Sequence, residues 1–157
     1  AREMYADNLK KNLRETYEMD LSDLSISETI DSIEYHLFPN ACFFPGLSLP
    51  MVYRFRPDGM NIDSTVFDLI FMQPKPKGRN SPPPAVPYDL GVEDSYCSVP
   101  GVDIGLGKVY DQDTVNLRSQ QQGFNTSKKG AETLGNYQEV RIRHFHQTIE
   151  RFIKSHS

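Results

Sequence analysis

The chain has 157 residues, with 17 Lys and Arg against 21 Asp and Glu, so its formal net charge is −4. The length favours one domain with a sizeable core, and 11% aromatic residues are too many for a disordered chain. The mild acidity argues against a nucleic-acid partner, and no apolar run approaches the ~18 residues of a membrane span. Two widely separated cysteines, Cys42 and Cys97, and no signal segment predict a reduced, cytoplasmic protein. Because the first residue is Ala1 rather than Met, we expect a piece of a longer chain.

A helix and a strand are predicted first. Residues 3–17 carry apolar side chains at a spacing of four, which indicates an amphipathic helix. A connector rich in Ser and Asp, 20–27, follows. Residues 29–38 alternate between apolar and polar side chains and predict a strand that has His36 on its polar face. The side chains predicted on its buried face are Ile33, Tyr35 and Leu37.

Two more strands are predicted, at 51–56 and 65–72, on either side of a Pro-Asp-Gly turn at 57–59. The strand at 65–72 is apolar on both faces, so we expect it to lie in the centre of the sheet. The short connections between the strands favour an antiparallel sheet.

A Pro-rich exposed loop is predicted at 74–101, because no helix or central strand tolerates that density of proline. A helix is predicted next at 104–122, with Asp103 capping its start and Gly123 ending it. The last helix is expected to begin at Asn136 with a capping box. Since strands and helices are segregated along the chain, the predicted class is α+β, in a single domain over residues 1–157.

The helix at 104–122 carries a carboxylate in the middle of its apolar side. Asp113 lies four residues from Val109 and from Leu117, which places all three on one helical face. A buried carboxylate must be hydrogen-bonded, ion-paired or bound to a metal. Asp113 is therefore either a structural or half-buried carboxylate or a functional group. The predicted buried face consists of Leu106, Val109, Tyr110, Leu117 and Phe124.

The remaining candidates carry weaker signals. Asp111 and Asp113 are two residues apart and point in different directions, so they cannot act as an acid/base pair. His144 and His146 have the wrong spacing for two metal ligands on one helix face. His36 either lines a pocket or faces solvent. The segment Pro84–Pro87 has the form of a polyproline ligand, which leaves an adaptor function open.

Four segments, in this order, resemble the C-terminal part of the catalytic domain of Rieske-type aromatic ring-hydroxylating oxygenase α subunits. They are Tyr35-His36-Leu37-Phe38-Pro39-Asn40, Tyr53-Arg54-Phe55-Arg56-Pro57-Asp58-Gly59, the stretch from Leu106-Gly107 through Gln112-Asp113 to Gln122-Gly123, and Glu139 to Ile149 with His144-Phe145-His146. The resemblance runs from about Tyr35 to Ile153.

The resemblance implies a helix-grip fold (Bet v 1/START-like), here incomplete, in which a curved antiparallel sheet packs on a long C-terminal helix. It also implies a mononuclear Fe(II) held by two histidines and a carboxylate. The matching Gln-Asp element makes Asp113 the expected iron ligand and catalytic residue, and the cavity between sheet and helix would bind an aromatic substrate. The residues expected to bind the substrate are Leu106, Val109, Tyr110, Leu117 and His36.

The family's other parts imply further partners. A Rieske [2Fe–2S] cluster needs Cys-x-His and Cys-x-x-His, and neither pattern follows Cys42 or Cys97. The family's pair of histidine ligands is also missing from this sequence. We therefore expect the chain alone to be inactive and to belong with the rest of an α subunit, with ferredoxin or reductase electron donors, in a homo-oligomer or α/β oligomer. The alternative is a non-catalytic helix-grip protein that binds a hydrophobic small molecule.

Overall fold

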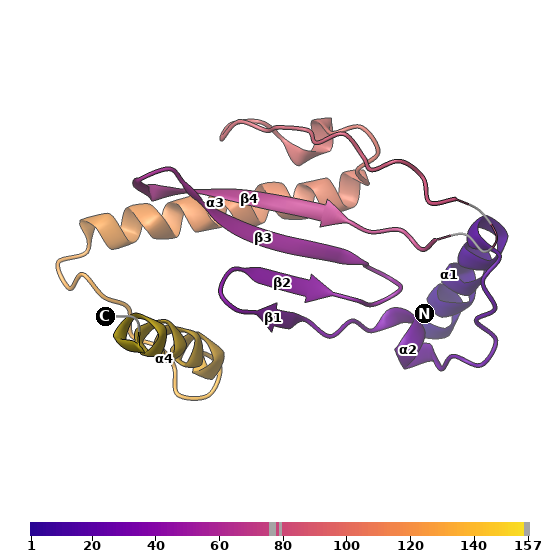
Figure 1. Ribbon diagram of the computed structural model, residues 1–157, viewed down its shortest axis with the longest axis horizontal. Helices are drawn as coiled ribbons and strands as arrows, with labels where there is room; N and C mark the ends of the chain where they lie inside the picture. Colours follow the sequence, from indigo (N-terminus) through magenta and orange to yellow (C-terminus); the bar gives the residue numbers. More distant parts are fainter. Residues whose placement is uncertain (76–77, 79, 156–157) are drawn as a thin grey trace. The chain divides into compact units, whose positions relative to one another are not determined.

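The computed structural model describes residues 1–75, 78 and 80–155, which form two compact units, 1–83 and 84–157 (Figure 1). Among the described residues the fold is α+β with an open, four-stranded antiparallel sheet, which confirms the predicted class and is consistent with an incomplete helix-grip fold. No helix among them is long and apolar enough to cross a membrane. Three residues of the predicted loop, Pro76, Lys77 and Arg79, lie outside the described residues. The single domain over the whole chain stays a prediction.

The first unit begins with two helices, α1 (Arg2–Tyr17) and α2 (Ile26–Ile30). Helix α1 confirms the helix predicted from its apolar spacing. The strand predicted at 29–38 forms only at 35–37, because α2 takes residues 29–30 and residues 31–34 are neither helix nor strand. Helix α2 forms because of a capping box, in which the Ser25 side chain accepts from the Glu28 backbone N–H and the Glu28 carboxylate accepts from the Ser25 backbone N–H.

The sheet consists of β1 (Tyr35–Leu37), β2 (Ala41–Phe44), β3 (Met51–Asp58) and β4 (Asn61–Phe71), paired in that order as an antiparallel meander. Strands β3 and β4 confirm the two later predicted strands. The turn predicted at 57–59 is shifted, because Pro57 and Asp58 still belong to β3 and the turn lies at 59–60, with Gly59 at a positive φ of 57°. Glycine adopts this backbone conformation without a steric penalty.

The predicted central position of the strand at 65–72 is wrong, because β4 lies at the edge of the described sheet. Apolar residues on both faces of a strand indicate that both faces are to be covered. They do not determine how many neighbouring strands form hydrogen bonds with it.

One face of the sheet is a row of aromatic rings. The ring centroids of Phe44 and Tyr53 lie 4.8 Å apart, those of Tyr53 and Phe67 5.2 Å, and those of Phe67 and Phe55 5.0 Å. His36 pairs with Cys42, which pairs with Tyr53, so His36 lies at the margin of this aromatic face.

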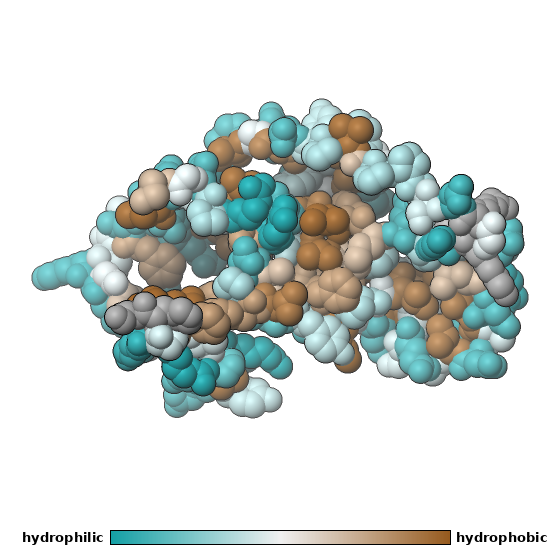
Figure 2. Space-filling view, in the orientation of Figure 1, coloured by the Kyte–Doolittle hydropathy of each residue, from teal (hydrophilic) through white to brown (hydrophobic). Residues whose placement is uncertain are grey.

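The prediction for the faces of β1 was therefore wrong. Leu37, expected to be buried, is 67% exposed and lies on the opposite face of the sheet from the rings. Tyr35 and Ile33 are exposed as well, and hydrophobic side chains reach the molecular surface in several places (Figure 2). Three residues of strand alternate too briefly to identify which side of the sheet is covered.

The face opposite the rings carries a charged cluster. Asp68 accepts from Arg54 Nε at 2.7 Å, from Arg56 Nε at 2.7 Å and from Arg56 Nη2 at 2.9 Å. These hydrogen bonds from the two arginines, the one from Arg56 above all, hold the pKa of Asp68 well below its ordinary value of 3.8.

This shift predicts a pH dependence of stability. Because the pKa of Asp68 is lower in the folded chain than in the unfolded chain, its contribution is complete above about pH 4 and is lost as the pH falls further. Asp68→Asn should therefore flatten the decrease in the free energy of unfolding below pH 4, measured by urea titration at several pH values. Arg56→Gln, which removes two of the three hydrogen bonds to Asp68, should flatten the decrease in the same direction. An unchanged decrease in both variants would contradict the role of the two arginines.

The second unit contains a short 3₁₀ helix, η1 (Tyr96–Ser98), and two α-helices, α3 (Ile104–Thr126) and α4 (Val140–Ser155). The predicted cap of α3 is confirmed, since the Asp103 side chain accepts from the Leu106 backbone N–H at 3.0 Å. The predicted end at Gly123 is wrong, because α3 continues to Thr126. A glycine inside a helix costs only about 1 kcal/mol, which neighbouring turns outweigh here.

The predicted start of α4 is also wrong. Residues 136–139 form a turn, and the Glu139 carboxylate accepts from the Gly135 backbone N–H rather than closing a capping box at Asn136. The helix begins at Val140, four residues after the predicted start. Its apolar side chains Ile142, Phe152 and Ile153 are exposed.

Candidate functional site

A segment before α3 is tied to that helix, and we call residues 91–98 the strap. Its anchor is Asp111, which accepts from Ser95 Oγ at 2.6 Å and from the Tyr96 backbone N–H at 2.8 Å. These bonds, the one from Ser95 above all, lower the pKa of the Asp111 carboxyl, so it is ionised at neutral pH. Carboxylates with such donors form hydrogen bonds stronger than those between neutral groups.

Packing reinforces this anchor. A Cβ on Gly107 would lie 3.0 Å from both the backbone nitrogen and the Sγ of Cys97, which is tighter than ordinary van der Waals contact, so a larger residue here would press the strap away from α3. One turn further, Tyr110 is 3% exposed, and its ring lies 5.4 Å from that of Tyr96. The Leu106-Gly107 pair of the sequence pattern thus has a packing reason.

A third tie lies at the other end of the strap. Arg118 donates to the Glu93 carboxylate at 2.7 Å and to the Val92 carbonyl at 2.5 Å. Since Gly107, Asp111 and Arg118 are spaced by four and seven residues, they share one face of α3 over three turns. The strap contacts this face at all three positions.

Asp113 lies on the opposite face of α3. It is exposed, and it makes no hydrogen bond or ion pair with another residue that the structure describes. Its neighbours on this face, Val109 and Leu117, are 50% and 56% exposed, and Phe124 is exposed too. The predicted buried face was therefore wrong: Tyr110 alone of its five residues is buried, and the covered face is the one that meets the strap.

The predicted site residues divide between the two units. Asp113, Leu106, Val109 and Leu117 lie together on the free face of α3, with Leu106 half-buried. Tyr110 turns toward the strap instead. His36 belongs to the first unit, on the aromatic face of its sheet.

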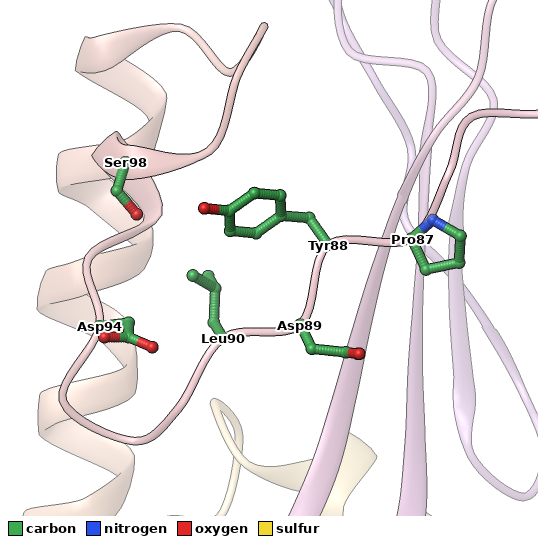
Figure 3. Close-up of a pocket in the computed structure, with 6 residues that line it drawn as sticks. All are labelled: Pro87, Tyr88, Asp89, Leu90, Asp94 and Ser98. Atoms are coloured by element: carbon green, nitrogen blue, oxygen red, sulfur yellow. The ribbon is translucent and has the colours of Figure 1, made fainter.

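A pocket of about 270 Å³ lies beside the strap and is open to solvent. Figure 3 shows the ring of Tyr88 and the side chain of Leu90 reaching into it from one side, opposite Ser98 and Asp94. Asp94 already accepts from the Gly91 backbone N–H at 2.8 Å. None of the residues predicted to bind the substrate lines this pocket.

The metal-ligating side chains of the described residues form no group of three or more His, Cys, Asp or Glu that could hold an ion. An iron site with two histidines and one carboxylate needs three such groups around one point. Asp113 fits the role of the carboxylate, because it is unpaired and accessible, but the residues that the structure describes do not complete the ligand set.

Sequence patterns had missed the strap. Ser95 and Asp111 are 16 residues apart, and neither carries a local signal that indicates the other. Ser95 does have the sequence signature of a helix cap, and it caps η1 by accepting from the Cys97 backbone N–H at 3.1 Å.

A comparison with protein families matches residues 8–155 to the catalytic domain of the ring hydroxylating alpha subunit. The chain therefore belongs to the ring hydroxylating alpha subunit family, within its catalytic domain. The general activity of this family is that of an oxygenase, and its members are α subunits of oligomeric systems with electron-transfer partners, generally associated with non-haem iron and a Rieske cluster. A search of curated proteins and a search of solved structures gave no match.

Proposed function

We propose that this chain is the substrate-cavity and iron-carboxylate part of a non-haem iron oxygenase that adds oxygen from O₂ to an aromatic substrate. In this proposal Asp113 is the anionic iron ligand. The observation that supports it is that the two faces of α3 have different surroundings. The strap contacts one face, and the other face presents the unpaired carboxylate of Asp113 among apolar side chains.

The side chains around Asp113 suit this role. Leu106, Val109 and Leu117 present an apolar surface to a substrate ring, and an apolar surround strengthens the attraction between a carboxylate and a cation. Tyr110 remains a candidate for substrate binding from the sequence, but its packing on Tyr96 favours a role in holding the strap on α3. His36, at the margin of the aromatic face, remains a candidate for substrate contact. When bound, the iron supplies the activation of dioxygen.

The parts of the oxygenase that this chain lacks would come from the rest of the α subunit and from its electron donors. Two histidine ligands and the Rieske cluster come from the rest of an α subunit, so we expect this chain alone to be inactive. Electrons come from a ferredoxin or reductase, in a cytoplasmic oligomer. The chain's own contribution is one iron ligand and part of the cavity wall.

The alternative is a non-catalytic protein that binds a hydrophobic small molecule. The lack of a three-residue ligand group among the described residues favours it, since apolar faces alone serve both functions.

Asp113→Leu separates the two functions. In a pure binder the change extends the apolar face, so affinity for a fluorescent apolar probe such as ANS should hold or rise. In the oxygenase, the subunit that contains this chain should lose its iron, measured by elemental analysis, while circular dichroism stays the same. Full iron content in the variant would rule out Asp113 as a ligand.

A further inference from the structure

Two carboxylates two residues apart on α3 have opposite surroundings. At about 100° per residue, Asp111 and Asp113 point about 200° apart. Asp111 accepts from Ser95 and from Tyr96, whereas Asp113 has no partner among the described residues. One carboxylate is committed to the strap and the other is left free.

The strap leaves the more apolar face of α3 exposed to solvent, although burial of apolar side chains would favour covering that face. The apolar side chains Val109, Leu117 and Phe124 are exposed, and the strap covers the face that carries Asp111 and Arg118. A strap that packed for apolar burial alone would gain more by covering the apolar face, because burial of a Val or Leu side chain contributes about 1.5–3 kcal/mol. The polar contacts of Asp111 and Arg118, together with the packing of Tyr110 on Tyr96, therefore hold the strap on this side of α3.

Those contacts also define the rotation of α3 about its axis. A turn of the helix by one residue, about 100°, would move Asp111 away from Ser95 and Arg118 away from Glu93 at the same time. It would also bring a side chain with a Cβ into the place of Gly107, where a Cβ would press on the Cys97 backbone nitrogen at 3.0 Å. All three contacts, at Gly107, Asp111 and Arg118, therefore form in the same rotation of α3 about its axis.

We infer that Asp111, held by Ser95 and Tyr96, is a positioning residue that fixes the rotation of α3 and so keeps Asp113 and its apolar face clear of the strap. The inference rests on the proposed function of Asp113 but assigns a task to a different residue. Asp111 acts through the strap and touches neither iron nor substrate.

The first test measures the strap in this chain. Asp111→Asn keeps the size of the side chain and removes its charge, and Ser95→Ala removes one donor. We expect hydrogen exchange at the Tyr96 amide to become about tenfold faster in each. Ser119→Ala is the matched control and should leave the Tyr96 amide protected, because the Ser119 hydroxyl donates to the Val115 carbonyl of its own helix at 2.9 Å and has no other partner in the described part of the chain. Unchanged exchange in Asp111→Asn would overturn the inference.

The second test asks whether the strap positions Asp113. The same variants are made in the oxygenase subunit that contains this chain, and Fe(II) content and the visible spectrum of the Co(II)-substituted form are measured. We expect Asp111→Asn and Ser95→Ala to lower the Fe(II) content severalfold and to alter the Co(II) spectrum, and Ser95→Thr, which keeps the hydroxyl, to restore both. A released strap with unaltered metal content and spectrum would overturn the positioning role. If instead Asp113→Asn retained full iron, the proposed function would fail, and the exchange result in this chain would still stand.

Discussion

Replacing Asp113 by alanine is expected to abolish iron retention in the oxygenase subunit that contains this chain. The site would lose its only anionic ligand. Loss of a residue that merely orients a ligand already costs 10–100-fold in metal affinity, so loss of the ligand itself should cost at least about 100-fold. Turnover should disappear with the iron, and elemental analysis of the purified subunit measures the effect directly.

The fold should survive the same substitution. Asp113 is exposed and has no partner among the described residues, and alanine has a higher helix propensity than aspartate. The melting temperature should therefore hold or rise slightly. Asp89→Ala, another exposed aspartate of the second unit, is the control and should retain iron. A stable Asp113→Ala subunit with full iron content would refute the assignment.

Substitution by alanine should change the free energy of unfolding in opposite directions at two glycines of α3, Gly107 and Gly123. Gly123 has open space around it, so Gly123→Ala should raise the free energy of unfolding by roughly 1 kcal/mol through helix propensity alone. At Gly107 the same gain is opposed by a clash, because the new Cβ would lie 3.0 Å from the Cys97 backbone nitrogen and 3.1 Å from its Cα. Backbone atoms cannot move aside as the end of a flexible side chain does, and overpacking of this kind costs about 1–3 kcal/mol.

We therefore expect Gly107→Ala to be less stable than Gly123→Ala by about 1–3 kcal/mol in urea unfolding of this chain. The clash should also release the strap, so hydrogen exchange at the Tyr96 amide should accelerate in the Gly107 variant only. Equal stabilisation by both substitutions would show that the strap does not pack closely on α3.

Local patterns predicted the elements whose signals lie within a few residues. The spacing in α1, the alternation in β3, the turn at Gly59 and the cap at Asp103 each depend on neighbours in the chain, and each was confirmed. Failures arose where two local signals competed. At 29–30 the alternation suggested a strand, but the capping box from Ser25 to Glu28 formed a helix.

The faces of the elements were harder to predict than their existence. Periodicity correctly grouped Asp113 with Val109 and Leu117, but it assumed that the apolar side of α3 is the covered one. The structure covers the other side, because a serine 16 residues earlier binds Asp111. For β1, the alternation placed His36 on the polar side, and His36 is exposed, but pairing with β2 and β3 shows that this side is the face of the sheet that carries the rings.

The sequence by itself determined the α+β class, the family and the residue proposed as iron ligand, since these depend on local spacing and on ordered motifs. Only the tertiary structure decided which of two neighbouring aspartates is free. The length, composition and charge of the chain are compatible with a free Asp111 as well as with a free Asp113. The choice depends on hydrogen bonds and on the packing of Tyr96 against Tyr110, both between residues distant in sequence, which a helical pattern alone does not reveal.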